Sequence, residues 1–327
     1  MTVPPSVGGR VSNVPSGCSM ATLAVAAFTW ISITQVRDEQ GIAREAQITD
    51  RYNAAIGNLG DDSPDVRLGG VYALQRIMQD SQRDQPTVMN VLSAYVRAHA
   101  PLPKDDKPGP SDPPHDVAAA LVVLSNRDRQ RDGTSTVDLQ WSYLRRAALG
   151  SADLGRAKLV GSDLSDAWLY GANLEGADLD LAMLQGAYLG EANLRKAQLL
   201  NANMRGADLS DADMGRANLD EADLRDTSLT GANLHSAYLS GLDLRGASLI
   251  DADLRNAVLE HADLRGANIG RADLRGASLL TANSRDADLD GADLRRVDLR
   301  GADLSLSNVR RSQLLVAYLY PSTKLAV

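Results

Sequence analysis

Residues 252–266 read ADLRNAVLEHADLRG, three consecutive five-residue units whose central leucines all carry numbers ending in 4 or 9. The same period continues without an insertion or deletion from Leu139 to Leu319. It gives 37 positions, and only Ser284 among them is not Leu, Met, Ile or Val. A fixed period of this kind indicates a repeat architecture in which each unit stacks on its neighbours.

A period of five residues suits neither regular secondary structure. On an α-helix each repeat would rotate the leucine by about 140° around the axis, which leaves no apolar stripe to bury. On a continuous strand the odd period would send successive leucines to opposite faces. The pattern therefore predicts a chain that runs extended for two or three residues and then turns a corner. Every repeat alanine and leucine then points into the core of a solenoid.

The units ADLRG, ANLEG, ADLSD and ADLRD resemble the pentapeptide-repeat family. The resemblance implies a mainly β fold, a right-handed quadrilateral β-helix with four units per coil. Residues 137–320 would then form about nine coils. All 12 prolines lie outside this range, as expected where backbone N–H groups are needed between coils.

Four positions depart from the repeat. Ser284 occupies a leucine slot, and we interpret it as a packing defect or as a hydroxyl bonded to a corner backbone rather than as a nucleophile. Thr227, Leu242 and Val297 enlarge the alanine slot, which more often signals a bulged coil than a ligand pocket. Whether Ser284 and Leu242 have a functional role stays open.

Outward-facing positions supply the candidate interaction surface. Trp168 and Tyr188 lie 20 residues apart, so we expect them to stack on one wall, and Tyr238 is a third outward aromatic residue. At 20 residues per coil several arginines also share a column, interleaved with a column of aspartates; a solvated charged surface is the alternative interpretation. The candidate arginines are Arg225, Arg245 and Arg265.

The charge balance bears on partners. The chain has a formal charge of −8, and residues 138–320 hold 27 acidic against 20 basic side chains. Some pentapeptide-repeat proteins imitate duplex DNA and bind type II topoisomerases, so the resemblance implies gyrase protection or inhibition as an alternative function. A DNA mimic needs an almost unbroken negative surface, and the arginine columns argue against one. Direct nucleic-acid binding is not expected.

The N-terminal part is organised differently. Residues 1–16 read as a disordered tail, and the uncharged stretch 17–36 has the length of a transmembrane helix. A signal peptide, a peripheral helix and a poorly ordered tail are the alternatives. One cysteine, Cys18, gives no disulfide framework, which favours a reducing compartment. We expect a membrane-anchored chain with a cytoplasmic solenoid, or else a soluble cytoplasmic protein.

Residues 37–100 are predicted to form a helical module. Ser63 and Pro64 mark one helix start, and a second helix begins near Pro86, so the two are expected to pair as a hairpin. This part of the chain resembles the module that precedes the repeats in membrane-anchored actinobacterial members of the family.

Three further segments flank the repeats. Residues 101–115 read as a Pro-rich linker, 116–136 as a short helix and cap of the solenoid, and 321–327 as a tail. The apolar end of the repeats is either a cap or a homodimer contact; its residues are Leu314, Leu315, Tyr318 and Leu319.

No pattern of catalytic or ligand-binding residues occurs in the sequence. The four histidines, at 99, 115, 235 and 261, show no metal-ligand spacing with each other or with Cys18. A narrow solenoid filled with Leu and Ala offers no cavity for a desolvated acid or base. The sequence therefore predicts no enzyme, cofactor or metal site. It predicts a membrane-tethered protein-interaction scaffold with an unknown protein partner.

Overall fold

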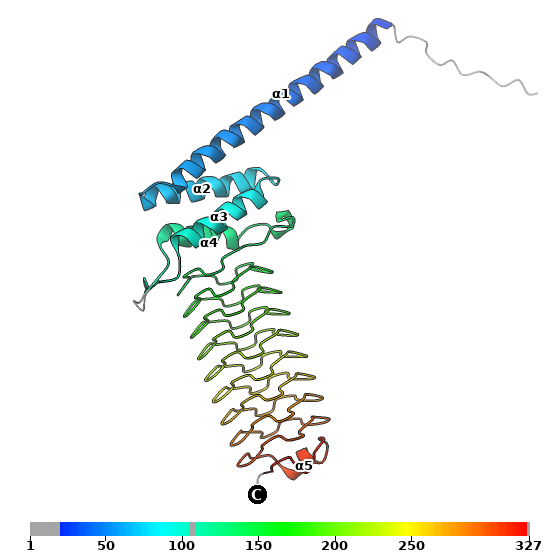
Figure 1. Ribbon diagram of the computed structural model, residues 1–327. Helices are drawn as coiled ribbons and strands as arrows, with labels where there is room; N and C mark the ends of the chain where they lie inside the picture. The colour runs from blue at the N-terminus through cyan, green and yellow to red at the C-terminus, as the bar shows by residue number, and fades with distance from the viewer. Residues whose placement is uncertain (1–19, 105–108, 326–327) are drawn as a thin grey trace, which may run out of the picture. The chain divides into compact units, whose positions relative to one another are not determined.

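The computed structural model describes residues 20–104 and 109–325, with the side chains of 20–39 left out. The predicted disordered tail at 1–16 lies outside the described residues. The chain divides into two units, with the boundary in the sequence between Asn53 and Ala54. Its helices are α1 Met20–Leu59, α2 Pro64–Asp80, α3 Gln85–His99, α4 His115–Ser125, the 3-10 helix η1 Arg129–Arg131 and α5 Arg311–Leu314 (Figure 1).

The first helix bears on the predicted membrane span. Throughout the ranges that the structure describes, no helix combines the length and the apolar character needed to cross a bilayer. The prediction of a transmembrane helix at 17–36 is therefore not supported, and its first three residues lie outside the described part.

Helices α2, α3 and α4 pack together, each against the other two. These three helices are called the helical module from here on, so that the name now includes α4, which lies beyond the predicted range 37–100. Their apolar faces meet in a core whose fully buried members include Leu74, Ile77, Leu92, Val96 and Leu124. Burial of each such side chain contributes roughly 1.5 to 3 kcal/mol before conformational entropy is subtracted. The predicted pairing of two helices is thus extended by a third helix, α4.

The start of α2 differs in detail from the prediction. Ser63 occupies the N-cap position and Pro64 the first turn, but the Ser63 side chain makes no capping hydrogen bond. The Ser63 N–H instead donates to Asp61 Oδ1 at 2.8 Å. The turn before the helix is therefore closed by an aspartate side chain.

A buried polar cluster links the three helices. The Asp116 side chain is 1% exposed and accepts hydrogen bonds from Arg67 Nε at 2.7 Å and from Tyr95 Oη at 2.5 Å. Arg67 also donates to the carbonyls of Asp61 and Asp62. A buried carboxylate requires such partners, since an unpaired charge in the interior is strongly unfavourable.

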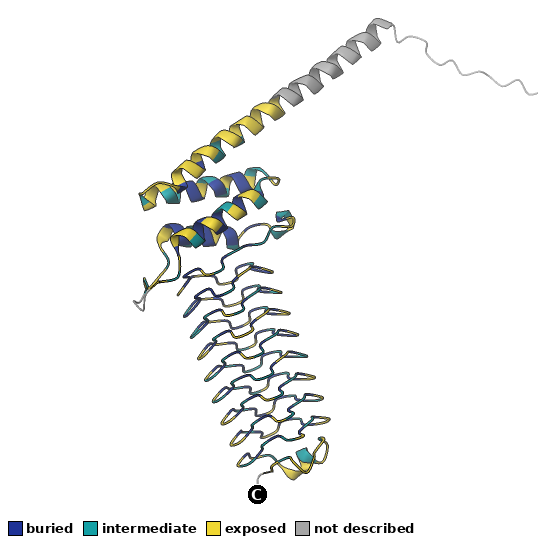
Figure 2. Cartoon of the chain, in the orientation of Figure 1, coloured by how far each residue is buried: buried dark blue, intermediate teal, exposed yellow. Residues whose placement is uncertain are grey.

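The repeats form a solenoid (Figure 1), in which one residue of each five-residue unit pairs with the residue 20 positions later. The bridges are parallel and isolated, one on each wall of a coil, and the backbone turns after every leucine. Every fifth residue from Leu139 to Leu304 is buried, with the alanines of the same walls (Figure 2). The predicted register of the core is therefore confirmed over this range.

Most corner residues are at least partly exposed. The second corner residue has a positive φ, 64° at Gly171 and 56° at Glu191. A side chain in this conformation costs about 1 to 2 kcal/mol, which the bonds between coils must offset. One of these bonds runs from the Gly171 N–H to the Gly190 carbonyl at 2.9 Å.

The helical module covers the N-terminal end of the solenoid. The buried Arg127 side chain donates to the carbonyls of Leu124 and Asp153, both at 2.6 Å, and pairs with Asp132 at 2.9 Å. The Asp153 N–H donates to the Ser125 carbonyl at 3.2 Å. Backbone groups of the first coils, which have no preceding coil, thus find partners in the segment after α4.

The C-terminal end departs from the predicted register. After Ser307 the chain forms α5 across the last coil and then returns, where Tyr318 pairs with Asp298 and Lys324 with Asp303. Leu319 is 40% exposed, and Val309 and Leu314 are only partly buried. The last three positions of the sequence period are therefore not core positions.

The four departures from the repeat leave the coils regular. Bridges on both sides of Leu242 and of Thr227 still join residues 20 apart, so the predicted bulges are absent from these coils. Thr227 Oγ1 donates to the Leu224 carbonyl at 2.7 Å, which satisfies the hydroxyl locally. Ser284 is fully buried and its Oγ has no partner, which favours a packing defect.

Candidate interaction surface

Three exposed aromatic rings lie together on one wall and its corner. The Trp168 ring centroid is 5.4 Å from that of Tyr188, one coil away, and 6.1 Å from that of Tyr170 at the corner. The side chains are 51%, 48% and 42% exposed, respectively. Trp168, Tyr170 and Tyr188 are called the aromatic cluster below; Tyr170 was not among the residues predicted from the sequence.

Glycines make room for two of these rings. A Cβ at Gly150 would lie 2.7 Å from the Trp168 indole, and one at Gly190 would lie 3.2 Å from the Tyr170 ring. The rings therefore lie close to the backbone of neighbouring corners. Their outer faces remain open to solvent.

Carboxylates border the cluster on one side. The Glu191 carboxylate, at the corner one coil after Tyr170, raises the pKa of the Tyr170 hydroxyl. Asp208 follows Tyr188 on the same wall, and Asp211 follows Glu191 at the same corner one coil later. None of these three carboxylates forms an ion pair with a basic side chain in the described part of the chain.

Tyr238 does not belong to the cluster. It is 53% exposed, but it pairs with Asn218 and Val258, ten residues out of phase with Trp168. Half of a 20-residue coil separates the two positions, so they lie on opposite walls.

The predicted arginine column forms a ladder with the aspartates. Each guanidinium binds the aspartate two residues before it, with Nη2–Oδ2 distances of 2.5 Å at Arg225, 2.7 Å at Arg245 and 2.6 Å at Arg265. The aspartate of the next coil lies farther from the same guanidinium: Arg225 Nε is 3.5 Å from Asp243 Oδ2. Hydrogen bonds from Arg265 also lower the pKa of Asp263. The column is therefore internally neutralised.

The ladder stops where the sequence changes. Asn203 replaces the aspartate before Arg205, so Arg205 reaches Asp226 at 3.3 Å instead. A second ladder on another wall pairs Arg255, Arg275 and Arg295 with the aspartates two residues before them. Exposed pairs of this kind contribute little to stability individually, because water and salt screen them.

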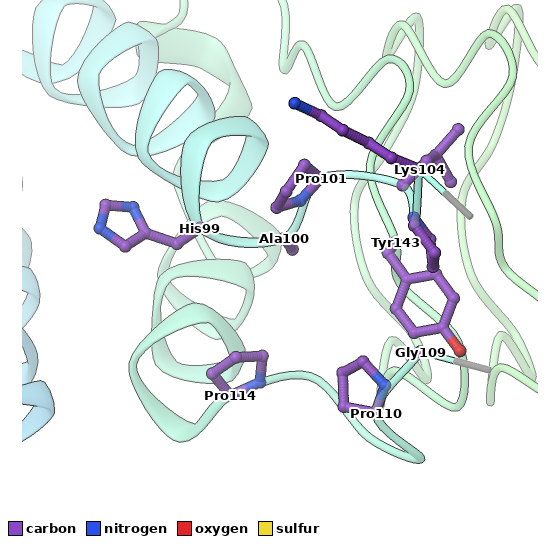
Figure 3. Close-up of a pocket in the computed structure, with 10 residues that line it drawn as sticks. His99, Ala100, Pro101, Lys104, Gly109, Pro110, Pro114 and Tyr143 are labelled. Carbon is purple, nitrogen blue, oxygen red and sulfur yellow. The ribbon is translucent and has the colours of Figure 1, made fainter. Parts of the chain in front are cut away.

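Two of the surface hollows lie beside residues of the solenoid that bear on a possible site. One of about 460 Å³ lies where the Pro-rich segment meets the first coil, and Figure 3 shows the Tyr143 ring beside Gly109 at its edge, with Pro101, Pro110 and Pro114 around it. The other, of about 410 Å³, lies over the second arginine ladder beside His235, whose buried Nδ1 has no partner.

Neither hollow gathers an acid, a base and a nucleophile in contact. Over the described ranges no group of three His, Cys, Asp or Glu side chains could hold a metal ion. Along the ladders, hydrogen bonds from Arg225 and Arg275 lower the pKa of Asp223 and Asp273. The surface offers binding chemistry: a cluster of mutually tilted aromatic rings, carboxylates without a basic partner among the described residues, and neutralised charge ladders.

Comparison with known proteins agrees with this geometry. A family model described as pentapeptide repeats matches in eight copies between residues 138 and 314. No curated protein matches the chain.

Several solved structures are similar over the repeats. QnrB1, a plasmid-mediated fluoroquinolone resistance protein, is 19% identical with a TM-score of 0.44, covering 50% of this chain and 86% of QnrB1. HetL, a pentapeptide repeat protein involved in heterocyst differentiation regulation in the cyanobacterium Nostoc sp., is 36% identical with a TM-score of 0.27, covering 53% and 76%. A pentapeptide repeat protein of the Arabidopsis thaliana thylakoid lumen is 29% identical with a TM-score of 0.24, covering 34% and 70%.

Proposed function

The chain belongs to the pentapeptide-repeat family, whose repeats imply a right-handed β-helix, and from that premise we propose that it is a non-catalytic scaffold whose outer walls bind another protein. The proposal rests on one observation above all. Leucine and alanine fill the solenoid from Leu139 to Leu304, so only the exterior carries recognition chemistry. The scaffold proposal does not depend on a membrane anchor.

Site-specific crosslinking tests the scaffold proposal. A photoreactive amino acid at an outward position, Ser228 on one wall or Gln198 on the opposite wall, is introduced into the full chain, which is then illuminated in its native cells. We expect one discrete crosslinked protein from one wall, competed by unlabelled chain. The absence of any crosslink from outward positions on all four walls would contradict the proposal.

A DNA-mimic function is a second candidate, because residues 138–320 hold 27 acidic against 20 basic side chains and their first half is the more acidic. The two neutralised arginine ladders weigh against it, since a duplex presents one phosphate charge every 1.7 Å or so of axis. Purified full-length chain should protect gyrase from a quinolone, or inhibit supercoiling, if the mimic function holds. No effect at large molar excess would remove this candidate.

The C-terminal end supports a proposed homodimer contact. Large apolar side chains there stay exposed although α5 covers the last coil, and Leu315 is 77% exposed. The exposed apolar residues are Leu306, Leu315, Val316, Tyr318, Leu319 and Tyr320. Such a patch is typical of a surface that a partner covers. Sedimentation equilibrium should show a dimer, and Leu315→Ser with Leu319→Ser should give a monomer; a wild-type monomer at high concentration would contradict the contact.

A further inference from the structure

The aromatic cluster is unusual for the wall that carries it. Beyond Tyr188 the same outward column continues as Asp208, Ser228 and Ser248, all polar. Three adjacent exposed rings are therefore confined to two coils of a wall whose following coils carry polar side chains. Aromatic side chains gathered in this way are enriched at protein interfaces, where they supply contact area with little loss of conformational freedom.

The charges around the cluster are one-sided. Glu191, Asp208 and Asp211 border it without a basic partner among the residues described. On the other border Arg145 is held by Asp166 at 2.8 Å, so its charge is cancelled. The surface at the rings therefore has negative potential, to which the negative faces of the aromatic rings add.

We propose that the aromatic cluster binds an arginine or lysine side chain of a partner protein, with the cation against the Trp168 and Tyr188 ring faces and its charge met by Glu191, Asp208 and Asp211. The inference deepens the proposed scaffold function and rests on it. A cation within about 6 Å of a ring centroid is attracted by the ring quadrupole, most strongly at tryptophan. Arginine suits the site best, because its planar guanidinium can stack on a ring and still donate to carboxylates.

The same features disfavour an anionic partner. Phosphate groups would face three carboxylates that have no basic partner in the described part of the chain, and the Arg145 guanidinium on the other border is already paired with Asp166. An apolar residue next to the partner's arginine would also gain contact with Tyr170, whose ring lies at the corner. The expected partner segment therefore carries an apolar residue next to its basic one.

Peptide titration of the full chain tests this inference. The first probe is a blocked heptapeptide, glycine-leucine-arginine-glycine-leucine-arginine-glycine, and the matched control carries citrulline in place of both arginines. Binding is followed by the indole N–H resonance of Trp168, assigned with Trp168→Phe. We expect the arginine peptide to shift this resonance in a saturable and salt-sensitive manner and to bind at least tenfold more tightly than the citrulline peptide. Equal binding of the two peptides, or none, overturns the inference.

Variants separate the cluster from the rest of the surface. Tyr188→Ala, and separately the triple change Glu191→Gln, Asp208→Asn and Asp211→Asn, should each weaken the arginine peptide at least tenfold. These amide replacements keep the size of each side chain, and asparagine tolerates the positive φ of 57° at position 211. Tyr72→Ala, which removes an exposed tyrosine of α2, serves as the matched control and should bind normally. A loss equal to that of Tyr188→Ala in this control contradicts the assignment.

The outcome also separates this inference from the scaffold proposal. A crosslinked partner whose capture survives both Trp168→Ala and the triple carboxylate change leaves the scaffold function standing and overturns the assigned site. Absence of any partner, together with specific arginine-peptide binding, overturns the scaffold function and leaves the cation site.

Discussion

At the scale of single residues, Ser284 is the clearest imperfection of the core. It is fully buried in a slot that holds leucine one coil before and one coil after it, and its hydroxyl has no partner. An unsatisfied buried hydroxyl costs about 1 to 3 kcal/mol. We expect Ser284→Leu to raise the free energy of unfolding by about 1 to 2 kcal/mol, because it removes this cost and adds apolar burial. Thermal unfolding measures the change.

Ser284→Ala is the control for that substitution, since it removes the hydroxyl without filling the slot. It should stabilise less than the leucine variant. A leucine variant that unfolds more easily than the wild type would mean that neighbouring side chains already fill the space, so that overpacking outweighs the gain.

At the scale of elements, the Asp116 cluster makes the helical module sensitive to acid. Burial acts to raise the pKa of Asp116, but hydrogen bonds from Tyr95 and Arg67 outweigh it, and the pKa is lowered. The carboxylate therefore stabilises the folded module above the unfolded pKa of about 3.9, and this stabilisation is lost as the pH falls through the lower folded value.

Asp116→Asn should accordingly reduce the free energy of unfolding by about 3 kcal/mol at neutral pH, since Arg67 loses its buried counter-charge. The difference from wild type should shrink below about pH 4. Urea unfolding followed by the helical circular dichroism signal measures both. Asp65→Asn, an exposed carboxylate of α2, should change little; a pH-independent deficit at Asp116 would argue that shape alone matters there.

The elements also show what the sequence could and could not predict. The buried leucines from Leu139 to Leu304 were predictable, because each repeat encodes one core position and the period does not slip. Leu314 and Leu319 keep the same period yet leave the core, since periodicity cannot tell whether the next coil forms or α5 replaces it. Tyr170 was missed because the 20-residue spacing aligns residues on one wall, whereas Tyr170 reaches Trp168 from a corner.

At the scale of the whole molecule, the solenoid depends on a five-residue register for its core and on a 20-residue register for its surface. Deleting the complete coil 231–250 preserves both registers. We expect this variant to stay folded and to lose about 1 to 3 kcal/mol, in proportion to the 20 residues removed. Its aromatic cluster lies before the deletion, so arginine-peptide binding should be unchanged.

Deletion of residues 246–250 alone preserves only the core register, because all four walls have the same inward pattern. Downstream leucines stay buried while the outer columns rotate by one wall, so that Asp263 no longer lies beside Arg245. We expect a folded chain with a broken arginine ladder, whereas removal of 246–248 turns the following leucines outward and unfolds the later coils. Circular dichroism and thermal unfolding of the three deletion variants, 231–250, 246–250 and 246–248, show which of them stay folded. If the five-residue deletion is as damaging as the three-residue one, the walls are not interchangeable, and the charge ladders on particular walls help to specify the fold.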